Sequence, residues 1–451
     1  MPLSWLLERF AEHRDQDAVV WQDRATKYGE LLDLVERANE FLAAEHVLPG
    51  QCVMLDADFS PGSIALLLAV MQNRNIIVPV ARQVTADRDK YAQLAEVSHR
   101  LSVDENDQYT RTADAATEVT HPLLVELKES GSPGLVLFSS GSTGEPKAAV
   151  HNLDFLLNKF KMPRHSQRMI TFLLFDHIGG FNTMMYTLSN HGCVITVTSR
   201  DAATICRAVE QHRAEVLPTS PTFLNLLLVS GEHEKHDLSS LKIINYATEV
   251  MPPATLRRLN DAFPGVTFRQ SYGMTELGIM RTQSRSNDSV WIRVGGEDYQ
   301  TRIVDGILHI KAKSSMLGYL NAPSPFDDEG WFNTQDEVEV DGEWLRFKGR
   351  KSEIINVGGE KVYPAEVETV LMEDSNVADA TVTKEPHAIM GNIVVAELTL
   401  HEEEPLSDVI KRVRQHCFTK LPSYKIPVKI RLSDATSRMS ERFKKQRTKS
   451  E

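Results

Sequence analysis

The sequence predicts an α/β protein. It should have a large N-terminal domain of mostly parallel sheets flanked by helices, a small β-barrel-like subdomain, and a small, mobile α+β domain at the C-terminus. Three observations support this fold class. Apolar strand-like runs alternate with helical patterns over the first 350 residues. From about Val294, alternating segments are joined at Asp-Gly pairs. A compact block with helices and strands of its own follows Arg350.

The parallel sheets are predicted by a repeated strand–helix–strand rhythm. The run QCVMLDA (51–57) is strand-like, SIALLLAVMQNR (63–74) has helical length and composition, and NIIVPV (75–80) is strand-like again. Four further strand-like runs follow: CVITVTS (193–199), AEVLPTS (214–220), LKIINYA (241–247) and VTFRQSYG (266–273). Strands separated by helices imply parallel pairing, with helices covering both faces of the sheet.

Two hairpins and a separate C-terminal block complete the prediction. TRIVDGILHIKA (301–312) and EVEVDGEWLRFKG (337–349) each alternate on both sides of an Asp-Gly pair, which is typical of β-hairpins. The C-terminal block has two helical and two strand-like segments: AEVETVLMED, LSDVIKRVRQHCF, ADATVTK and IVVAELTL. We therefore expect domains at 1–350 and 351–451.

Composition excludes several classes of function. The net charge of −12 over 451 residues argues against a nucleic-acid binder, which needs a broad basic surface. The N-terminus carries charge within its first residues, so it predicts no signal peptide. No apolar run reaches the roughly 20 residues that span a bilayer, so no stable membrane insertion is expected. The four cysteines are scattered without a CxxC pair, which fits a cytoplasmic protein.

The segment FSSGSTGEPKAAV (138–150) has the chemistry of a phosphate-binding loop. Glycines permit unusual backbone conformations, and hydroxyl groups with successive backbone N–H groups can surround an anion. Lys147 adds positive charge. The spacing differs from that of a Walker loop, however. Taken alone, this segment is equally compatible with a flexible surface loop.

Further motifs in the same chain resemble the AMP-forming adenylating superfamily, and acyl-CoA synthetases most of all. This superfamily also includes luciferase-like enzymes and the adenylation domains of peptide synthetases. The similar motifs follow in the family's order: FSSGSTGEPK, FLLFDHIGGFNTM, SYGMTE, GILHIKAKSSMLGYLNAP, GWFNTQDEVEV and FKGRKSEIINVGGEKVYPAEVE. The resemblance covers essentially the whole chain. It implies activation of a carboxylate by ATP with release of pyrophosphate.

The resemblance implies a role for each motif residue around ATP. The β- and γ-phosphates would be held by the loop that contains Ser139, Ser140, Gly141, Ser142, Thr143, Gly144 and Lys147. Thr275 would contact the α-phosphate, and Glu276 would bind Mg²⁺ through its carboxylate.

The nucleoside would lie against the later motifs. Tyr272, followed by Gly273, would lie on the adenine face. Asp336 would accept hydrogen bonds from the ribose hydroxyls, and Arg350 would support the ribose or the AMP phosphate. Thr248 and Glu249 stand where the family has an adenine-contacting loop, which is a weaker assignment.

The acyl pocket leaves two alternatives open. His177 matches the histidine that borders the carboxylate in acyl-CoA synthetases, whereas an aspartate near Asp176 pairs with the substrate's ammonium group in amino-acid-activating relatives. We favour a plain acyl substrate because HIGG follows as a block. Phe181 and Tyr246 are expected on the pocket wall.

The second step requires a thiol. Gly358 and Gly359 would form part of a pantetheine tunnel after the C-terminal domain rotates about a hinge near Ser352. The acceptor is either CoA or a phosphopantetheinyl carrier protein, and no motif separates the two.

The chain departs from the family pattern in three places. Ser352 replaces the usual Asp or Lys of the hinge, and Gln335 replaces the glycine before Asp336. Near the C-terminus the chain reads SERFKKQ, so Glu441 and Arg442 stand where the family has glycine and its catalytic lysine. Arginine keeps the charge but is a wide planar group, so the change is not conservative.

These departures leave three hypotheses. The leading one is an acid–thiol ligase that makes acyl-CoA, with Arg442 substituting for the lysine at a reduced rate. The second is a stand-alone enzyme that loads an acyl or amino acid onto a carrier protein. The third is a catalytically impaired nucleotide-binding paralogue.

Overall fold

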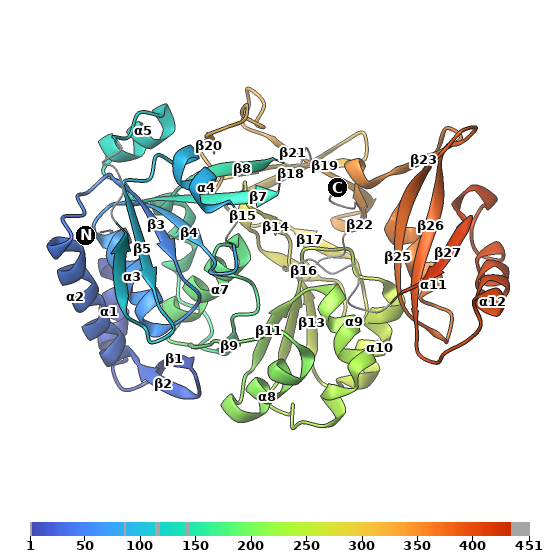
Figure 1. Cartoon of the computed structure of the whole chain (residues 1–451), viewed down its shortest axis with the longest axis horizontal. Coiled ribbons are helices and arrows are strands. Elements are labelled where there is room, and N and C mark those ends of the chain that lie inside the picture. The colour runs from blue at the N-terminus through green and yellow to red at the C-terminus, as the bar shows by residue number, and fades with distance from the viewer. Residues whose placement is uncertain (1, 85–86, 113–117, 141–144, 434–451) are drawn as a thin grey trace.

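Two seven-stranded sheets form the framework of the N-terminal domain (Figure 1). The computed structural model of the protein describes residues 2–84, 87–112, 118–140 and 145–433. One sheet has the order β13-β12-β11-β9-β10-β1-β2 and the other β20-β8-β7-β4-β3-β5-β6. Pairing is parallel from β13 to β1 and from β7 to β5. The predicted parallel α/β framework is therefore confirmed.

The strands of the first sheet are β1 (Asp17–Trp21), β2 (Arg24–Lys27), β9 (Arg168–Ile170), β10 (Cys193–Ile195), β11 (Val216–Thr219), β12 (Ile243–Tyr246) and β13 (Thr267–Gln270). Those of the second are β3 (Cys52–Asp56), β4 (Ile76–Val80), β5 (His99–Val103), β6 (Tyr109–Thr112), β7 (Gly134–Ser140), β8 (Pro146–Asn152) and β20 (Gly318–Tyr319).

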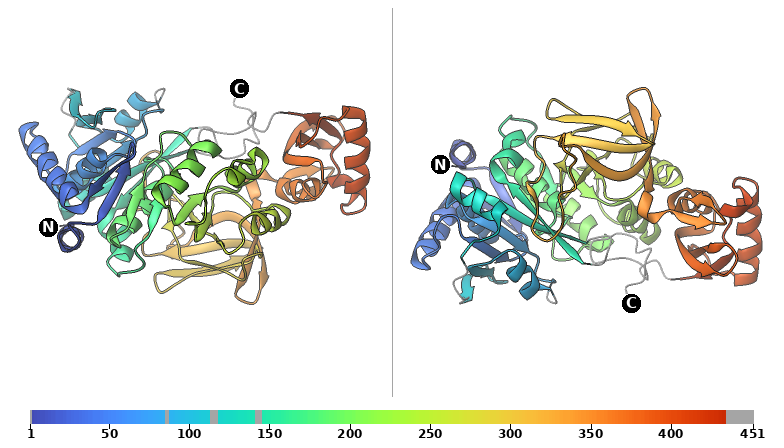
Figure 2. Two further views of the ribbon diagram at one scale, coloured as in Figure 1. Left: turned by 90° about the horizontal axis from the view of Figure 1, so that it is seen from below. Right: turned by 90° about the horizontal axis from the view of Figure 1, so that it is seen from above.

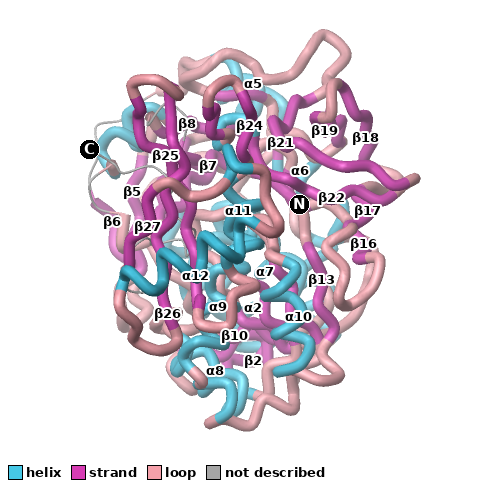
Figure 3. The backbone as a smooth tube through the Cα atoms, turned by 90° about the vertical axis from the view of Figure 1, so that its right-hand side faces the viewer, coloured by secondary structure: helices cyan, strands magenta, loops and turns pink. Residues whose placement is uncertain are grey.

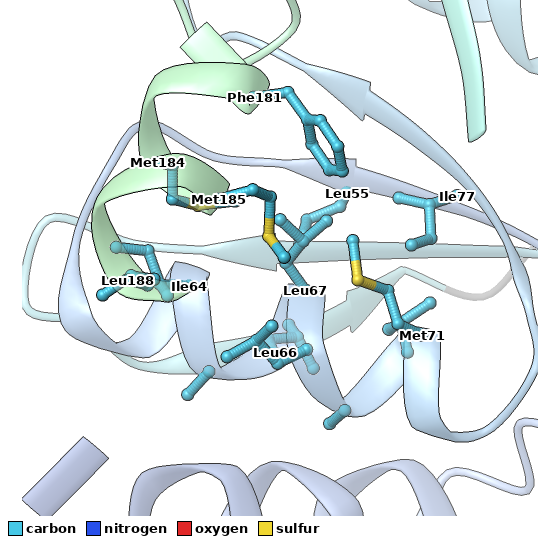
Figure 4. Close-up of a cluster of buried hydrophobic side chains, with 14 of the residues drawn as sticks. Leu55, Ile64, Leu66, Leu67, Met71, Ile77, Phe181, Met184, Met185 and Leu188 are labelled. Atoms are coloured by element: carbon cyan, nitrogen blue, oxygen red, sulfur yellow. The ribbon is translucent and has the colours of Figure 1, made fainter. Parts of the chain in front are cut away.

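The largest hydrophobic core contains residues of both sheets and of several helices, among them α3 (Pro61–Gln72) and α7 (Ile178–Ser189). Figure 4 shows Phe181, Met184 and Met185 of α7 directed toward side chains of α3 and toward Leu55 and Ile77 of the second sheet. Helix α3 is buried on every side along most of its length, which explains its almost entirely apolar sequence.

The remaining helices of the N-terminal domain are α1 (Ser4–Glu12), α2 (Tyr28–Ala44), α4 (Arg88–Leu94), α5 (Pro122–Ser130), α6 (Leu153–Leu156), η1 (Asn158–Phe160), α8 (Ala202–His212), α9 (Pro221–Ser230), η2 (Glu232–Glu234) and α10 (Pro253–Ala262). Among the described residues, no helix has both the length and the apolar character needed to cross a membrane.

A six-stranded antiparallel sheet forms the predicted small subdomain and lies on one side of the molecule (Figure 2). Its strands are β16 (Thr282–Ser284), β17 (Ile292–Val294), β18 (Tyr299–Val304), β19 (Ile307–Ala312), β21 (Phe332–Asp341) and β22 (Trp344–Arg350). The predicted turn at Asp305 and Gly306 is present, with φ of 51° and 77°. Both residues have positive φ, which a two-residue hairpin turn of type I′ requires.

The smaller C-terminal domain lies at the end of the molecule that faces the viewer in Figure 3. Its helices α11 (Pro364–Leu371) and α12 (Leu406–Phe418) pack on the sheet through a shared apolar core. Its elements are η3 (Lys351–Glu353), β23 (Ile355–Val357), β24 (Glu360–Val362), α11 (Pro364–Leu371), β25 (Val377–His387), β26 (Gly391–Leu400), α12 (Leu406–Phe418), η4 (Ser423–Lys425) and β27 (Lys429–Leu432). The predicted α+β character is confirmed.

Candidate active site

A cavity of about 160 Å³ lies where β12 and β13 end and where β21 and β22 meet them. Ligands of open parallel sheets commonly bind at this carboxyl edge. The cavity is lined by six of the residues that the sequence assigns to the nucleotide: Thr248, Glu249, Tyr272, Gly273, Asp336 and Arg350. Residues up to 102 positions apart in the chain are thus brought to one site.

Asp336 lies at the centre of a hydrogen-bonded group. Tyr272 Oη donates to its Oδ2 at 2.5 Å, and Arg350 Nε donates to its Oδ1 at 3.2 Å. Burial raises the pKa of the Asp336 carboxyl, although Arg350 and the Tyr272 hydroxyl act in the opposite direction. Both carboxylate oxygens are thereby fixed in orientation, and each retains a lone pair for a further donor.

Tyr272 has one face already covered. Its ring stacks on Phe347 with centroids 4.5 Å apart and an interplanar angle of 26°. A base that contacts Tyr272 must therefore use the opposite face or the ring edge.

Two non-glycine residues beside the cavity have left-handed backbone conformations. Gln335 has φ of 61°, and its N–H donates to Asn333 Oδ1 at 2.9 Å. Thr248 has φ of 78°, which is rare for a β-branched residue. Its neighbour Glu249 accepts from the N–H and the hydroxyl of Thr222, at the start of α9. The glycine-to-glutamine change noted in the sequence thus falls on a backbone position that favours glycine.

Tyr319 contacts both Glu276 and Lys147, and the sequence motifs assigned no role to this tyrosine. Tyr319 Oη donates to Glu276 Oε1 at 2.5 Å, and Lys147 Nζ lies 5.2 Å from the centre of the Tyr319 ring. Burial lowers the pKa of Arg350, but Asp336, Tyr272 and Glu276 more than offset this, so its pKa lies above the ordinary value. Glu276 is therefore electrostatically linked to the cavity.

The phosphate loop itself lies largely outside the described residues. Gly141, Ser142, Thr143 and Gly144 are not described, but the strands on either side of them are. β7 and β8 pair antiparallel as far as Ser139 with Lys147 and Ser140 with Pro146. The predicted loop therefore joins the two strands of a hairpin. Arg442 and Glu441 also lie outside the described residues.

His177 is the N-cap residue of α7, and its Nδ1 accepts from the N–H of Gly179 at 3.0 Å. The preceding Asp176 is buried and lies within electrostatic range of Arg200. Phe181 and Tyr246 belong to two hydrophobic cores and are 2% and 1% exposed. The structure gives both aromatic residues a packing role, and their place on the acyl pocket stays a prediction.

The predicted thiol-tunnel glycines lie apart from the cavity. Gly358 and Gly359 form the turn between β23 and β24, with φ of 59° and 93°, and neither lines the cavity. Ser352 lies in η3, directly after β22. The C-terminal domain contacts the rest of the chain at several points, including Tyr363 Oη, which donates to Glu337 Oε2, and the Ala378 carbonyl, which accepts from Asn225 Nδ2 at 2.9 Å. No sequence motif predicted the contact between Tyr363 and Glu337.

Comparison with known proteins identifies the family. The AMP-binding enzyme family matches residues 6–320, and the AMP-binding enzyme C-terminal domain matches residues 366–441. The chain therefore belongs to the AMP-binding enzyme family, as the motifs predicted.

Similar curated proteins and solved structures cover nearly the whole chain. Indoleacetate–CoA ligase of Aromatoleum aromaticum is 26% identical over 97% of this chain and 95% of its own length. 2-Succinylbenzoate–CoA ligase of Bacillus pumilus is 25% identical over 99% of this chain and 97% of its own. The crystal structure of the anthranilate CoA ligase AuaEII with anthranoyl-AMP aligns over 96% of this chain and 94% of its own, with a TM-score of 0.82 and 19% identity. This structural likeness supports the fold.

Proposed function

We propose that this protein uses ATP to activate a carboxylic acid as its acyl-adenylate, releasing pyrophosphate, and then transfers the acyl group to the thiol of CoA. One observation carries the proposal: the cavity joins an aromatic ring, a buried carboxylate and an arginine in Tyr272, Asp336 and Arg350. These groups suit the base, the ribose hydroxyls and the phosphate of a nucleotide. The similar curated proteins named as CoA ligases support the same reaction.

The residues would act mainly by orientation and charge. The barrier to adenylation is repulsion between an anionic carboxylate and a polyanionic triphosphate, so positioned cations and donors lower it. In our proposal Asp336 orients the ribose, Arg350 and Lys147 supply positive charge, and Thr275 donates to the α-phosphate. The carboxylate of the acid then attacks the α-phosphorus, and the bond to pyrophosphate breaks.

Glu276 suits a magnesium ion held jointly with the substrate. Among the described residues there is no group of three or more His, Cys, Asp or Glu side chains that forms a complete metal site. Mg²⁺ in nucleotide enzymes is commonly held by one or two carboxylates together with substrate phosphates. Glu276 fits that pattern because Tyr319 orients one of its oxygens. When bound, the ion would neutralise phosphate charge.

We propose an apolar or aromatic acid without an amino group as substrate. Asp58 and Asp176 both act on Arg200, so a cation already lies near the aspartate that would otherwise attract a substrate ammonium. His177 Nδ1 accepts a hydrogen bond, so the neutral ring carries its proton on Nε2. Two relatives are named for aromatic acids, indoleacetate and 2-succinylbenzoate.

Thioester formation would require movement of the C-terminal domain. Gly358 and Gly359 do not line the cavity in this structure. We propose that residues 351–451 rotate against residues 1–350 about Ser352, which brings the two glycines to the adenylate. A hinge needs backbone freedom more than charge, so serine is compatible with this role.

Acid-dependent exchange between labelled pyrophosphate and ATP tests the proposal. A panel of indole-3-acetate, 2-succinylbenzoate, anthranilate, medium-chain fatty acids and amino acids identifies the acid. Thioester formation is then compared with free CoA and with a phosphopantetheinyl carrier protein. We expect exchange with at least one aromatic acid and a product with CoA. Exchange followed by transfer only to the carrier supports the loading enzyme, and ATP binding without any exchange supports the impaired paralogue.

A further inference from the structure

Residues 275–277 form a short hairpin loop. Each of its three backbone carbonyl groups accepts a hydrogen bond from a residue outside the hairpin. The loop joins β14 (Gly273–Met274) to β15 (Gly278–Ile279). His151 Nε2 lies 2.7 Å from the first carbonyl oxygen, that of residue 275. The Met316 N–H donates to the second at 2.8 Å, and Ser314 Oγ donates to the third at 2.7 Å. We call these three donors the loop clamp.

The two side chains of the loop clamp are buried. His151 is 0% and Ser314 is 6% exposed. Because the partner of His151 Nε2 is a carbonyl oxygen, that nitrogen carries the proton. Burial lowers the pKa of His151 to about 4, although its hydrogen bond to the Thr275 carbonyl acts in the opposite direction. The imidazole is therefore a fixed neutral donor around pH 7.

The loop clamp also links the 275–277 loop to the two paired strands that carry Lys147 and Tyr319. His151 lies on β8, the strand that directly follows the phosphate loop and begins beside Lys147. β8 pairs with β20, which carries Tyr319, the partner of the Glu276 side chain. One pair of strands thus fixes both the backbone of the loop and the carboxylate it presents.

We propose that His151 and Ser314 are positioning residues for adenylation: they set the 275–277 loop so that the Thr275 hydroxyl and the Glu276 carboxylate face the phosphates of ATP. This role rests on the proposed function. Within the hairpin the Leu277 N–H donates to the Met274 carbonyl at 3.2 Å, but this bond does not fix the directions of the three loop carbonyls. Donors outside the hairpin to all three carbonyls restrict the orientation of the loop before the substrate binds. This is the condition for efficient positioning.

Three substitutions test the loop clamp against a matched control. His151→Leu removes the donor at similar volume, His151→Gln restores a donor near the position of Nε2, and Ser314→Ala removes a single hydroxyl. Ser189→Ala is the control, because Ser189 is also buried and its Oγ also donates to a backbone carbonyl, at the far end of α7. Each variant is assayed by pyrophosphate exchange, with kcat and the KM for the acid determined separately.

For His151→Leu we expect exchange kcat to fall about tenfold to a hundredfold, since small misplacement of reacting groups has effects of that order. The KM for the acid should be unchanged, and His151→Gln should recover most of the rate. Ser314→Ala should lose about fivefold, as expected for one neutral hydrogen bond. The reaction of pre-formed acyl-adenylate with CoA lacks the β- and γ-phosphates and should fall much less than exchange.

Two outcomes would overturn the proposal. If His151→Leu and Ser314→Ala match Ser189→Ala in exchange, the loop clamp does not position the loop for catalysis. If both half-reactions and the thermal stability fall in parallel, and His151→Gln restores neither, the residues are only structural. A wild-type protein without exchange for any acid would instead contradict the proposed function itself.

Discussion

Replacing Asp336 by asparagine should separate nucleotide binding from folding. A carboxylate that accepts two ribose hydrogen bonds contributes more than a neutral amide, because hydrogen bonds to charged groups contribute about 1.5–3 kcal/mol against about 0.5–1.5 for neutral ones. The difference over two bonds is about 2–3 kcal/mol, which lowers ATP affinity about 30- to 150-fold.

The same substitution should leave the folded state at least as stable near pH 7. Burial raises the pKa of Asp336 above its ordinary 3.8, so the folded protein holds the proton more readily than the unfolded chain does. The stability that this group contributes is present below pH 3.8 and is lost as the pH rises through the higher folded pKa. At pH 7 the ionised carboxylate therefore opposes folding, and asparagine removes that cost.

Calorimetric titration with ATP and Mg²⁺, together with urea unfolding at pH 7, checks both parts. Asp341→Asn is the control, because Asp341 ends the same strand and pairs with Arg285 at 2.6 Å with its side chain 57% exposed. This control should change neither quantity appreciably. An Asp336→Asn variant that binds ATP like the wild type, or that unfolds much more easily, would contradict this role of Asp336.

Four further predictions use other parts of the structure. Gln335→Gly should raise the free energy of unfolding by about 0.5–1 kcal/mol in urea titration, since it relieves a left-handed glutamine; a lower value would contradict the strain argument. Arg442→Lys should speed pyrophosphate exchange, and an unchanged rate would show that Arg442 does not hold the catalytic-lysine position. Tyr363→Phe removes the hydrogen bond to Glu337, so trypsin should cut faster near the hinge; equal cleavage would show that this bond does not restrain the domain. The pKa of His151 is about 4 when folded against an ordinary 6.5, so wild-type stability should fall by about 3 kcal/mol as the pH drops through that window. Unfolding of His151→Gln should show a flatter pH dependence, and an equal slope would contradict the buried neutral imidazole.

Local sequence patterns predicted the framework well where an element is defined by its own residues. The buried strand–helix–strand unit 51–80 and the Asp-Gly hairpins are specified by apolar runs and turn chemistry within a few residues. The strand predicted from the run 193–199 was too long. β10 ends at Ile195, which pairs with Ile170, the last residue of the neighbouring strand β9. Strand ends depend on a neighbour that a local pattern does not contain.

The motifs predicted which residues form the candidate site. They do not contain the contacts between residues that lie far apart in the chain. The cavity joins residues from three separate motifs. The contacts of Tyr319 with Glu276 and of His151 with Thr275 bridge 43 and 124 positions. Neither spacing has any periodicity that reveals it. Tertiary packing alone defines these partners, so they required the structure.

The most direct test of the account is a crystal structure of the protein grown with ATP, Mg²⁺ and the acid found by exchange. We expect the nucleotide in the cavity, with its ribose hydroxyls on the Asp336 carboxylate and its base beside Tyr272. Density for the nucleotide at another place, or an unchanged cavity at saturating ATP, would contradict the assignment of this cavity as the adenylation site.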